Sequence, residues 1–428
     1  MSAEARRAAR HSLHSVGVVC GLAAGAWLGS AEAPTKLVAI GFSPFIVSLG
    51  MVMGVFVARW TLPVALKGTS YVWQDLRGKP HLIIWAIVAG MLWAVANTLT
   101  VFAIRDVGLS IAFPLWNVNS LVGLFWGWLL FRELRGGAGR ERLKVLAGAV
   151  AIVIGACVLA YVTADGSRAG QGSTAPGVLA ALGAGLLWGT MYIPYRKAYI
   201  SGMNPLSFVT VFTFGELATV FALAAIFDGG AARVLISLRQ AQPALFCLFL
   251  GGFCWVLGDL FQQYAAKYVG ISRGIPLSNT NQLWGLAWGA LVFGELASMT
   301  GGAQALVVVG SLIMIAGAAA ISLAEAPPTE QREWQAAMER ECVRYGLDRE
   351  RVAAALAGSE SSTLTRSSWR WWEMLVVGAA IAVFIWLGLH AKMQAIVVDA
   401  GWLLTLGAAS FALLLAGGVV LWKRTRFC

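Results

Sequence analysis

Charged residues are scarce in this 428-residue chain: Asp, Glu, Lys and Arg make up 12% of it, against 58% hydrophobic residues. An ordinary soluble domain carries about twice that share of charge. The basic residues that give the net charge of +11 are dispersed between long apolar runs, which disfavours a nucleic-acid surface. The composition therefore excludes an ordinary soluble fold and indicates that lipid is the solvent of this protein.

Cysteine and histidine are also few, with six and four copies. The cysteines form no closely spaced pair and mostly lie in apolar runs, which is typical of small buried side chains and not of disulfides. The scattered histidines form no metal-ligand pattern. The chain also has no P-loop and no evident nucleophile–base set. We therefore expect no catalytic site, no metal and no cofactor, and a pump driven directly by ATP is disfavoured.

Long apolar runs are what the chain does contain. Twelve of them are long enough to cross about 30 Å of hydrocarbon as helices, which satisfy their own backbone hydrogen bonds in lipid. We expect these spans near residues 14–33, 40–62, 81–103, 111–131, 144–163, 177–197, 204–227, 244–266, 273–293, 303–323, 373–391 and 401–422. The sequence thus predicts an all-α integral membrane protein.

The first ten spans are two copies of one unit. Val107 to Leu134 matches Val269 to Leu296 without a gap, and the same register pairs Trp93 with Trp255 and Asn97 with Asp259. Identical pairs in the matched segments include Pro114/Pro276, Asn117/Asn279, Asn119/Asn281, Trp126/Trp288, Gly127/Gly289 and Glu133/Glu295. Because each copy has an odd number of spans, the second enters the membrane from the opposite side. This predicts a ten-helix, five-plus-five inverted-repeat transporter core with two additional C-terminal helices.

The expected domains follow from this repeat. Residues 1–165 form the first five-helix repeat, residues 175–323 the second, residues 325–370 a charged cytosolic segment with short helices, and residues 373–428 the two extra helices with a cytosolic tail. In the charged segment, Thr329 and Asp348 are suited to cap two short helices. The first helix places Trp334, Met338 and Cys342 on one face. Both a docking hairpin and an amphipathic linker on the membrane surface fit this pattern.

The basic residues predict the orientation. With the N-terminus in the cytoplasm, all but six of the 32 Lys and Arg lie in inner segments, and the six are Lys36, Arg105, Arg168, Arg233, Arg239 and Lys392. This bias places both termini inside, and a bacterial cytoplasmic membrane is expected. Arg6, Arg7 and Arg10 before an apolar run resemble a secretory signal. Because residues 20–37 have a repeat counterpart at 180–197, we expect the segment to be retained.

Charged side chains within the spans are the first candidates for chemistry because a charge in hydrocarbon is costly. Asp259 lies well inside the eighth span, and Glu216 in the middle of the seventh. We expect either to take up and release a proton during transport, with helix packing as the structural alternative.

Amides and indoles supply the candidate binding groups. Amides offer donors and acceptors without charge, which suits neutral hydroxyls, and aromatic rings suit the C–H faces of sugars. The candidate substrate-binding residues are Trp93, Asn97, Asn117, Asn119, Trp255, Asn279, Asn281 and Gln282.

The proline–asparagine segment, the Trp-Gly pair and the closing Phe-x-Glu-Leu of each repeat resemble the drug/metabolite transporter superfamily. The opening Gly29 to Lys36 and its copy Gly189 to Arg196 look most like the glucose/ribose porter family, related to rhamnose carriers. The likeness covers residues 14–323. It implies ten helices around a central cavity, alternating access, and sugar uptake that is often coupled to protons. The extra helices and the charged segment depart from this pattern, and are candidates to modulate transport or to hold copies of the chain in a homo-oligomer.

The first functional hypothesis is a secondary transporter for a neutral monosaccharide or similar polyol, with the solute, the lipid bilayer and protons as its partners. An exporter of amino acids, nucleosides or lipophilic cations is the second, and a cation is favoured if Glu216 faces the cavity. A non-transporting sensor or scaffold that signals through residues 325–370 is the third. The sequence names neither the solute nor the direction of transport.

Overall fold

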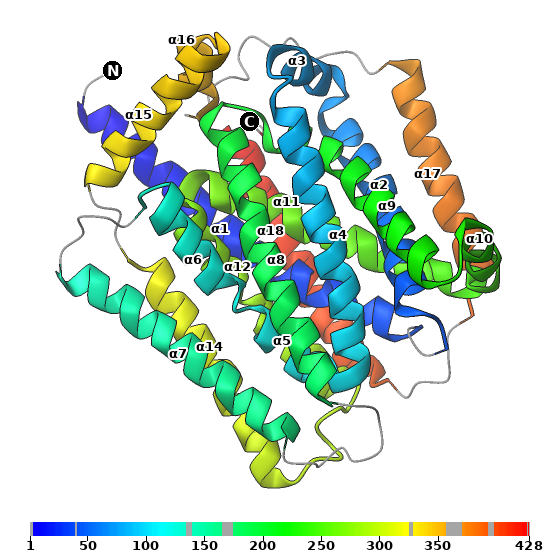
Figure 1. The fold of residues 1–428 in the computed structure, drawn as a ribbon. Helices are drawn as coiled ribbons and strands as arrows, with labels where there is room; N and C mark the ends of the chain where they lie inside the picture. The colour runs from blue at the N-terminus through cyan, green and yellow to red at the C-terminus, as the bar shows by residue number, and fades with distance from the viewer. Residues whose placement is uncertain are drawn as a thin grey trace.

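The computed structural model describes residues 3–38, 41–133, 139–164, 174–324, 328–356, 370–392, 398–425 and 427, and the described elements are all helical (Figure 1). The side chains of Arg6, Arg7 and Arg10 and the linker 165–173 between the expected repeats lie outside this description.

The helices follow the repeat. The first copy contains α1 (Ala3–Lys36), α2 (Pro44–Lys67), α3 (Ser70–Gly78), α4 (Leu82–Val107), α5 (Leu109–Trp116), α6 (Asn119–Leu130) and α7 (Gly139–Ala164). The second contains α8 (Thr174–Ile200), α9 (Pro205–Phe227), α10 (Ala231–Gln240), η1 (Gln242–Ala244), α11 (Leu245–Val269), α12 (Ile271–Ser278), α13 (Asn281–Ala287), η2 (Trp288–Val292) and α14 (Gly301–Ser322). The remaining helices are α15 (Pro328–Tyr345), α16 (Arg349–Leu356), α17 (Trp371–Leu389) and α18 (Ala400–Thr425).

Eleven segments of the described chain are long and apolar enough to cross a membrane, which confirms an all-α, multi-pass membrane protein. The expected ninth span is not among them. It is divided into α12, α13 and the π-helical η2, none of which reaches the length of a single spanning helix.

The fourth and ninth expected spans break at equivalent asparagines. Proline lacks an N–H and clashes with the preceding helical turn, so a helix ends readily near it. The Asn117 N–H bonds back to the Pro114 carbonyl at 3.1 Å, and the Asn279 N–H bonds to the Pro276 carbonyl at 3.2 Å. The chain then restarts as α6 in the first copy and as α13 in the second. These breaks bring backbone and amide groups to the middle of the bundle.

The two copies pack against each other through equivalent helices. Helix α1 lies on α11 and its counterpart α8 lies on α4, while α2 packs on α11 and α9 on α4. The broken helices cross-pair, with α5 on α13 and α6 on α12, and α7 packs on its own counterpart α14. Each repeat therefore completes the core of the other, and neither forms a separate globule.

The ends of the helices show that the copies run in opposite directions. Lys36 at the end of α1 meets Glu295, whereas Arg196 near the end of the counterpart α8 meets Glu133. The chain from α5 to α6 begins at Leu109, which bonds to Glu295, and it ends just before Glu133. The two ion pairs therefore lie at opposite ends of the bundle. Both described termini, α3, α15 and α16 gather at the end that holds Glu133 (Figure 1).

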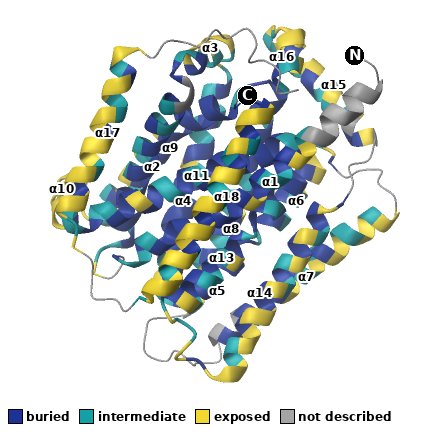
Figure 2. Cartoon of the chain, turned by 180° about the vertical axis from the view of Figure 1, so that it is seen from behind, coloured by how far each residue is buried: buried dark blue, intermediate teal, exposed yellow. Residues whose placement is uncertain are grey.

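Burial separates the core from the periphery. Helices α1, α2 and α11 are among the most buried spans, whereas α7, α17 and α18 present broad exposed faces (Figure 2). The exposed side chains on those outer helices are largely apolar, as expected for surfaces that contact lipid.

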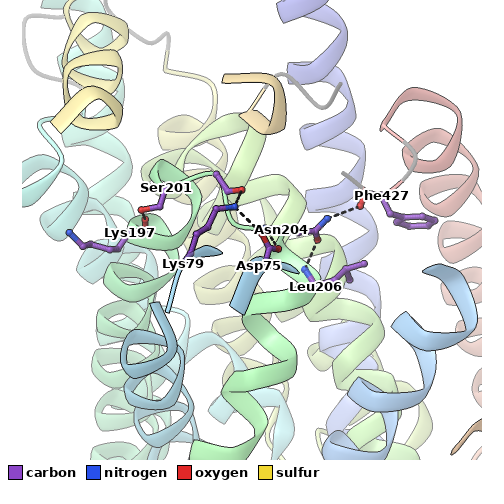
Figure 3. A network of polar contacts seen from close by, with 8 residues as sticks. Asp75, Lys79, Lys197, Ser201, Asn204, Leu206 and Phe427 are labelled. Atoms are coloured by element: carbon purple, nitrogen blue, oxygen red, sulfur yellow. Dashed lines mark hydrogen bonds and ion pairs between the residues drawn. The ribbon is translucent and has the colours of Figure 1, made fainter. Parts of the chain in front are cut away.

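A polar network holds the turns together at the Glu133 end (Figure 3). Lys79 donates to the Gly202 carbonyl at 2.7 Å and pairs with Asp75 at 2.9 Å. Asp75 also accepts the Asn204 N–H at 3.1 Å, and the Asn204 side chain donates to the Phe427 carbonyl at 3.2 Å. The turns before α4 and α9 and the C-terminal tail are thereby joined.

Candidate transport cavity

A small cavity of about 30 Å³ lies where the broken helices meet the core helices. Its lining comes from both repeats and consists of Leu28, Glu32, Trp93, Phe113, Trp116, Asn117, Asn119, Trp188, Met191, Tyr192, Trp255, Gln262 and Asn281. That volume accommodates about one water molecule. Five of the eight residues predicted to bind substrate are in this lining: Trp93, Asn117, Asn119, Trp255 and Asn281.

The amides at the two helix breaks bond across the repeats. The Asn117 side chain donates to Asn281 Oδ1 at 2.7 Å, and the Asn279 side chain donates to Asn119 Oδ1 at 3.0 Å. These bonds are related by the repeat, since Asn117 corresponds to Asn279 and Asn119 to Asn281. A network of this kind fixes the position of each break relative to the other.

Four indole rings form the apolar part of the wall. Trp93 and Trp255, which are repeat counterparts, meet edge to face with ring centroids 4.4 Å apart. Trp116 and Trp188 make a second such contact at 5.7 Å. The arrangement gives the cavity flat apolar surfaces beside its amides.

Glu32 is the cavity residue that sequence reasoning missed. Its side chain lies on α1, is 3% exposed, and its Oε2 atom has no hydrogen-bond partner among the described residues. The signal is present in the sequence, because Glu32 is an acid inside an apolar span. The comparison of the repeats does not select it, because its counterpart is Tyr192 and the position is not an acid in both copies.

Asp259 lies outside the cavity lining and is paired. Its carboxylate forms an ion pair with Arg59 on α2 and accepts a hydrogen bond from Gln263 at 2.7 Å. The charge count assigns Arg59 to an inner segment, but this residue is 1% exposed within the α2 span. Removing either partner of such a buried pair would leave the other as a lone buried charge.

Glu216 is fully buried on α9 and also lies outside the lining. Neither of its oxygens has a hydrogen-bond partner among the described residues. Gly90 of α4 closely approaches the backbone of α9 at Phe212 and Glu216. Glu216 therefore lies where α4 and α9 pack closely against each other.

The other three predicted binding residues are buried outside the cavity lining. Asn97 donates to Ser48 on α2 at 2.9 Å, and Asn279 is engaged in the amide network. Gln282 is buried on α13 but does not line the cavity.

Two related carboxylate clusters close the bundle at its ends. We call Glu295 with Lys36 and Ser110 the Glu295 cluster, and Glu133 with Arg196 and Ser272 the Glu133 cluster. Glu295 accepts the Leu109 N–H at 3.0 Å and the Ser110 N–H at 2.8 Å. Glu133 accepts the Ser272 N–H at 3.0 Å and pairs with Arg196 at 2.8 Å. Each glutamate thus binds the first N–H groups of a broken helix, where negative charge is favoured.

Glu133 lies just beyond the end of its span. Burial alone would raise the pKa of Glu133, but the Arg196 guanidinium, the Ser272 hydrogen bonds and Arg273 together hold that pKa below its ordinary value. The carboxylate therefore stays charged, as its ion pair requires.

Helix α15 covers the Glu133 cluster. The centroid of the Trp334 ring lies 3.5 Å from the Arg196 guanidinium carbon, and Glu330 pairs with Arg273 of α12. Lys197 of α8 pairs with Glu341 at 2.6 Å. The apolar face predicted for this helix packs on the protein, since Met338 and Cys342 join a buried cluster with Ile200.

Crossed repeats, broken helices and a central cavity are the arrangement expected of a membrane transporter. Residues 175–322 match the model of the EamA-like transporter family.

Two curated relatives match part of the chain. The "Putative sugar uptake protein" of Lactobacillus johnsonii is 34% identical over 26% of this chain and 39% of its own length. The "Putative ribose uptake protein RbsU" of Latilactobacillus sakei is 30% identical over 26% of this chain and 34% of its own length. The match thus spans little more than a third of either relative. A solved structure described as "Crystal structure of protein" aligns with 70% of this chain and 96% of its own at 14% identity, with a TM-score of 0.42.

Proposed function

We propose that this protein is a secondary transporter for a monosaccharide or similar neutral polyol, which binds in the central cavity. The main support is a set of polar atoms in residues that line the cavity and lack partners among the described residues: Trp93 Nε1, Trp188 Nε1 and Asn117 Oδ1. Buried polar atoms are normally paired. Two donors and one acceptor suit hydroxyl groups, which both donate and accept.

The small size of the cavity requires the repeats to move during transport. At about 30 Å³ it is far smaller than a sugar, so the solute enters only when one end of the bundle opens. The two clusters are the closures in this proposal: opening the Glu295 cluster admits solute from one side, and opening the Glu133 cluster releases it on the other. This is alternating access between inverted repeats.

The proposed orientation follows the distribution of basic residues. The Glu133 end, with both described termini and α15, faces the cytoplasm, and the membrane is the bacterial cytoplasmic membrane. The names of the two relatives support sugar uptake as the direction and substrate class.

A second candidate function is export of an organic cation. A carboxylate beside four indole rings also suits a cation, through charge and through the electron-rich ring faces. Glu32 is the observation that favours this candidate.

The test is transport by purified protein in proteoliposomes, with radiolabelled D-ribose, D-glucose and tetraphenylphosphonium as probes. Uptake of a sugar that saturates supports the first function, and movement of only the cation supports the second. Trp188→Phe keeps an aromatic ring but removes an unpaired donor. We expect it to raise KM about fivefold to tenfold, the value of about one hydrogen bond.

Trp60→Phe is the matched control. Trp60 Nε1 is likewise buried without a partner among the described residues, but Trp60 does not line the cavity. Its variant should leave KM unchanged. Equal effects of the two substitutions would contradict the placement of the solute.

A further inference from the structure

We propose that Glu32, and neither Asp259 nor Glu216, is the group that takes up and releases the coupling proton. This inference rests on the proposed function, because it assigns a role within the same cavity. The three acids differ in surroundings: Glu32 lines the cavity, Asp259 is held by Arg59, and Glu216 is packed between helices away from the cavity.

The first step concerns access. A coupling group must reach water from each side in turn, so it has to lie on the path that alternating access exposes. Glu32 is the acid in the cavity lining. Its uncharged neighbours there include the amides of Asn117 and Asn281 and the ring of Trp255.

The second step concerns charge. The helices that pack on α1 are α11, α12, α13, α18 and η2. Their acidic and basic residues are Asp259, Lys267, Arg273, Lys423 and Arg424, and the described part of α1 itself adds His14 and Lys36. Asp259 pairs with Arg59, Arg273 with Glu330, and Lys36 with Glu295. No basic side chain of the described residues is within ion-pair distance of Glu32, and Tyr192 is the other ionisable residue in the lining.

The third step joins proton and solute. Closing both ends around a charged, unpaired carboxylate costs several kcal/mol, because the charge loses its water. Protonation of Glu32 from the aqueous side forms one O–H bond and removes that charge. Occlusion around the solute is then favoured, and the proton is returned to water when the other end opens. Solute and proton thereby move together.

The experiment compares two readouts in proteoliposomes that contain the full chain, with radiolabelled D-ribose and D-glucose. Accumulation driven by an inward proton gradient requires coupling, whereas counterflow at equal pH requires only exchange of solute. For Glu32→Gln we expect accumulation to fall to simple equilibration, with counterflow retained within about threefold. Glu32→Asp should restore accumulation at least in part.

Glu216→Gln is the matched control, since it also removes a buried and unpartnered carboxylate, and it should accumulate solute as the unmodified protein does. Asp259→Asn should impair both readouts, because it leaves Arg59 buried without its charge partner. The inference is overturned if Glu32→Gln still accumulates solute. It is also overturned if that variant loses counterflow, because Glu32 would then bind the solute itself.

A solute-free measurement separates this inference from the proposed function. Infrared difference spectra of purified protein between about pH 8 and about pH 5 report protonation of carboxyl groups. We expect a protonated-carboxyl band that is absent in Glu32→Gln and present in Glu216→Gln. If neither sugar is transported, the proposed function fails, and persistence of the band in Glu32→Gln would overturn the inference independently.

Discussion

The two ends of the bundle carry equivalent ion pairs, and these pairs differ in how deeply they are buried. In the Glu295 cluster, Lys36 is 22% exposed and Glu295 6%. In the Glu133 cluster, Arg196 is 4% exposed and Glu133 is fully buried. Helix α15 accounts for part of this difference, because Trp334 covers Arg196. The charged segment after the second repeat thus covers the ion pair at one end, and its counterpart at the other end is more exposed.

Glycine shows how alike the clusters remain. A Cβ atom on Gly127 would collide with Ser272 and approach Glu133, and one on its counterpart Gly289 would collide with Ser110 and Glu295. Each cluster therefore requires a glycine at the same repeat position. The difference lies in what covers the ion pair, and the predictions below test that difference.

The largest effect is expected for Glu133→Gln. The substitution leaves Arg196 buried without a charge partner, which costs about 3–5 kcal/mol. We expect a large fall in the thermal unfolding temperature of the purified protein. A loss no greater than that of Glu295→Gln would contradict the comparison.

Glu295→Gln should have a smaller effect, about 1–2 kcal/mol, because Lys36 can turn toward water and the glutamine oxygen still accepts a hydrogen bond. Thermal unfolding under the same conditions measures it. Opening of this end should also become easier, which labelling of a cysteine introduced at Ser110 would detect.

Trp334→Ala removes the ring that covers Arg196. The expected loss is about 1 kcal/mol, the usual value of a partly buried cation–π contact. The Glu133 end should open more often, measured as faster labelling of a cysteine introduced at Ser272. Trp334→Phe keeps an aromatic face and is the control, so equal labelling of the two variants would show that the ring has no role.

The smallest effect concerns pH. Because the pKa of Glu133 is lowered in the folded protein, its contribution to stability is present above the unfolded pKa of about 4.3 and is lost as pH falls through the folded value. The difference in unfolding temperature between the unmodified protein and Glu133→Gln should thus stay constant from about pH 7 to about pH 5.5. A difference that shrinks over this interval would mean that Glu133 is not held by Arg196 as described.

Much of the fold was predictable because the sequence features that determine it occur in both repeats. The apolar runs predict the helices, and the duplicated proline and asparagine positions mark the broken segments that meet at the cavity. Five predicted binding residues line it. Asn97 and Asn279 do not, because their amides bond to Ser48 and Asn119, and Gln282 is buried outside the lining.

Single-copy features were harder to predict. Glu32 and Arg59 have no equivalent acid or base in the other repeat, so a comparison of the copies does not select them. The partner of Asp259 is 200 residues away in sequence, and no local pattern indicates such a pairing. The contacts of α15 with α8 and α12 are equally dependent on the completed bundle.

The most direct test of the account is to lock each end in turn. Lys36→Cys with Glu295→Cys, and Arg196→Cys with Glu133→Cys, replace both members of an ion pair, so no lone charge is left buried. Sugar counterflow is measured in a background without the native cysteines, before and after oxidation and after reduction. The account predicts that either cross-link stops counterflow and that reduction restores it. Counterflow that continues with an end cross-linked would contradict alternating access through this cavity.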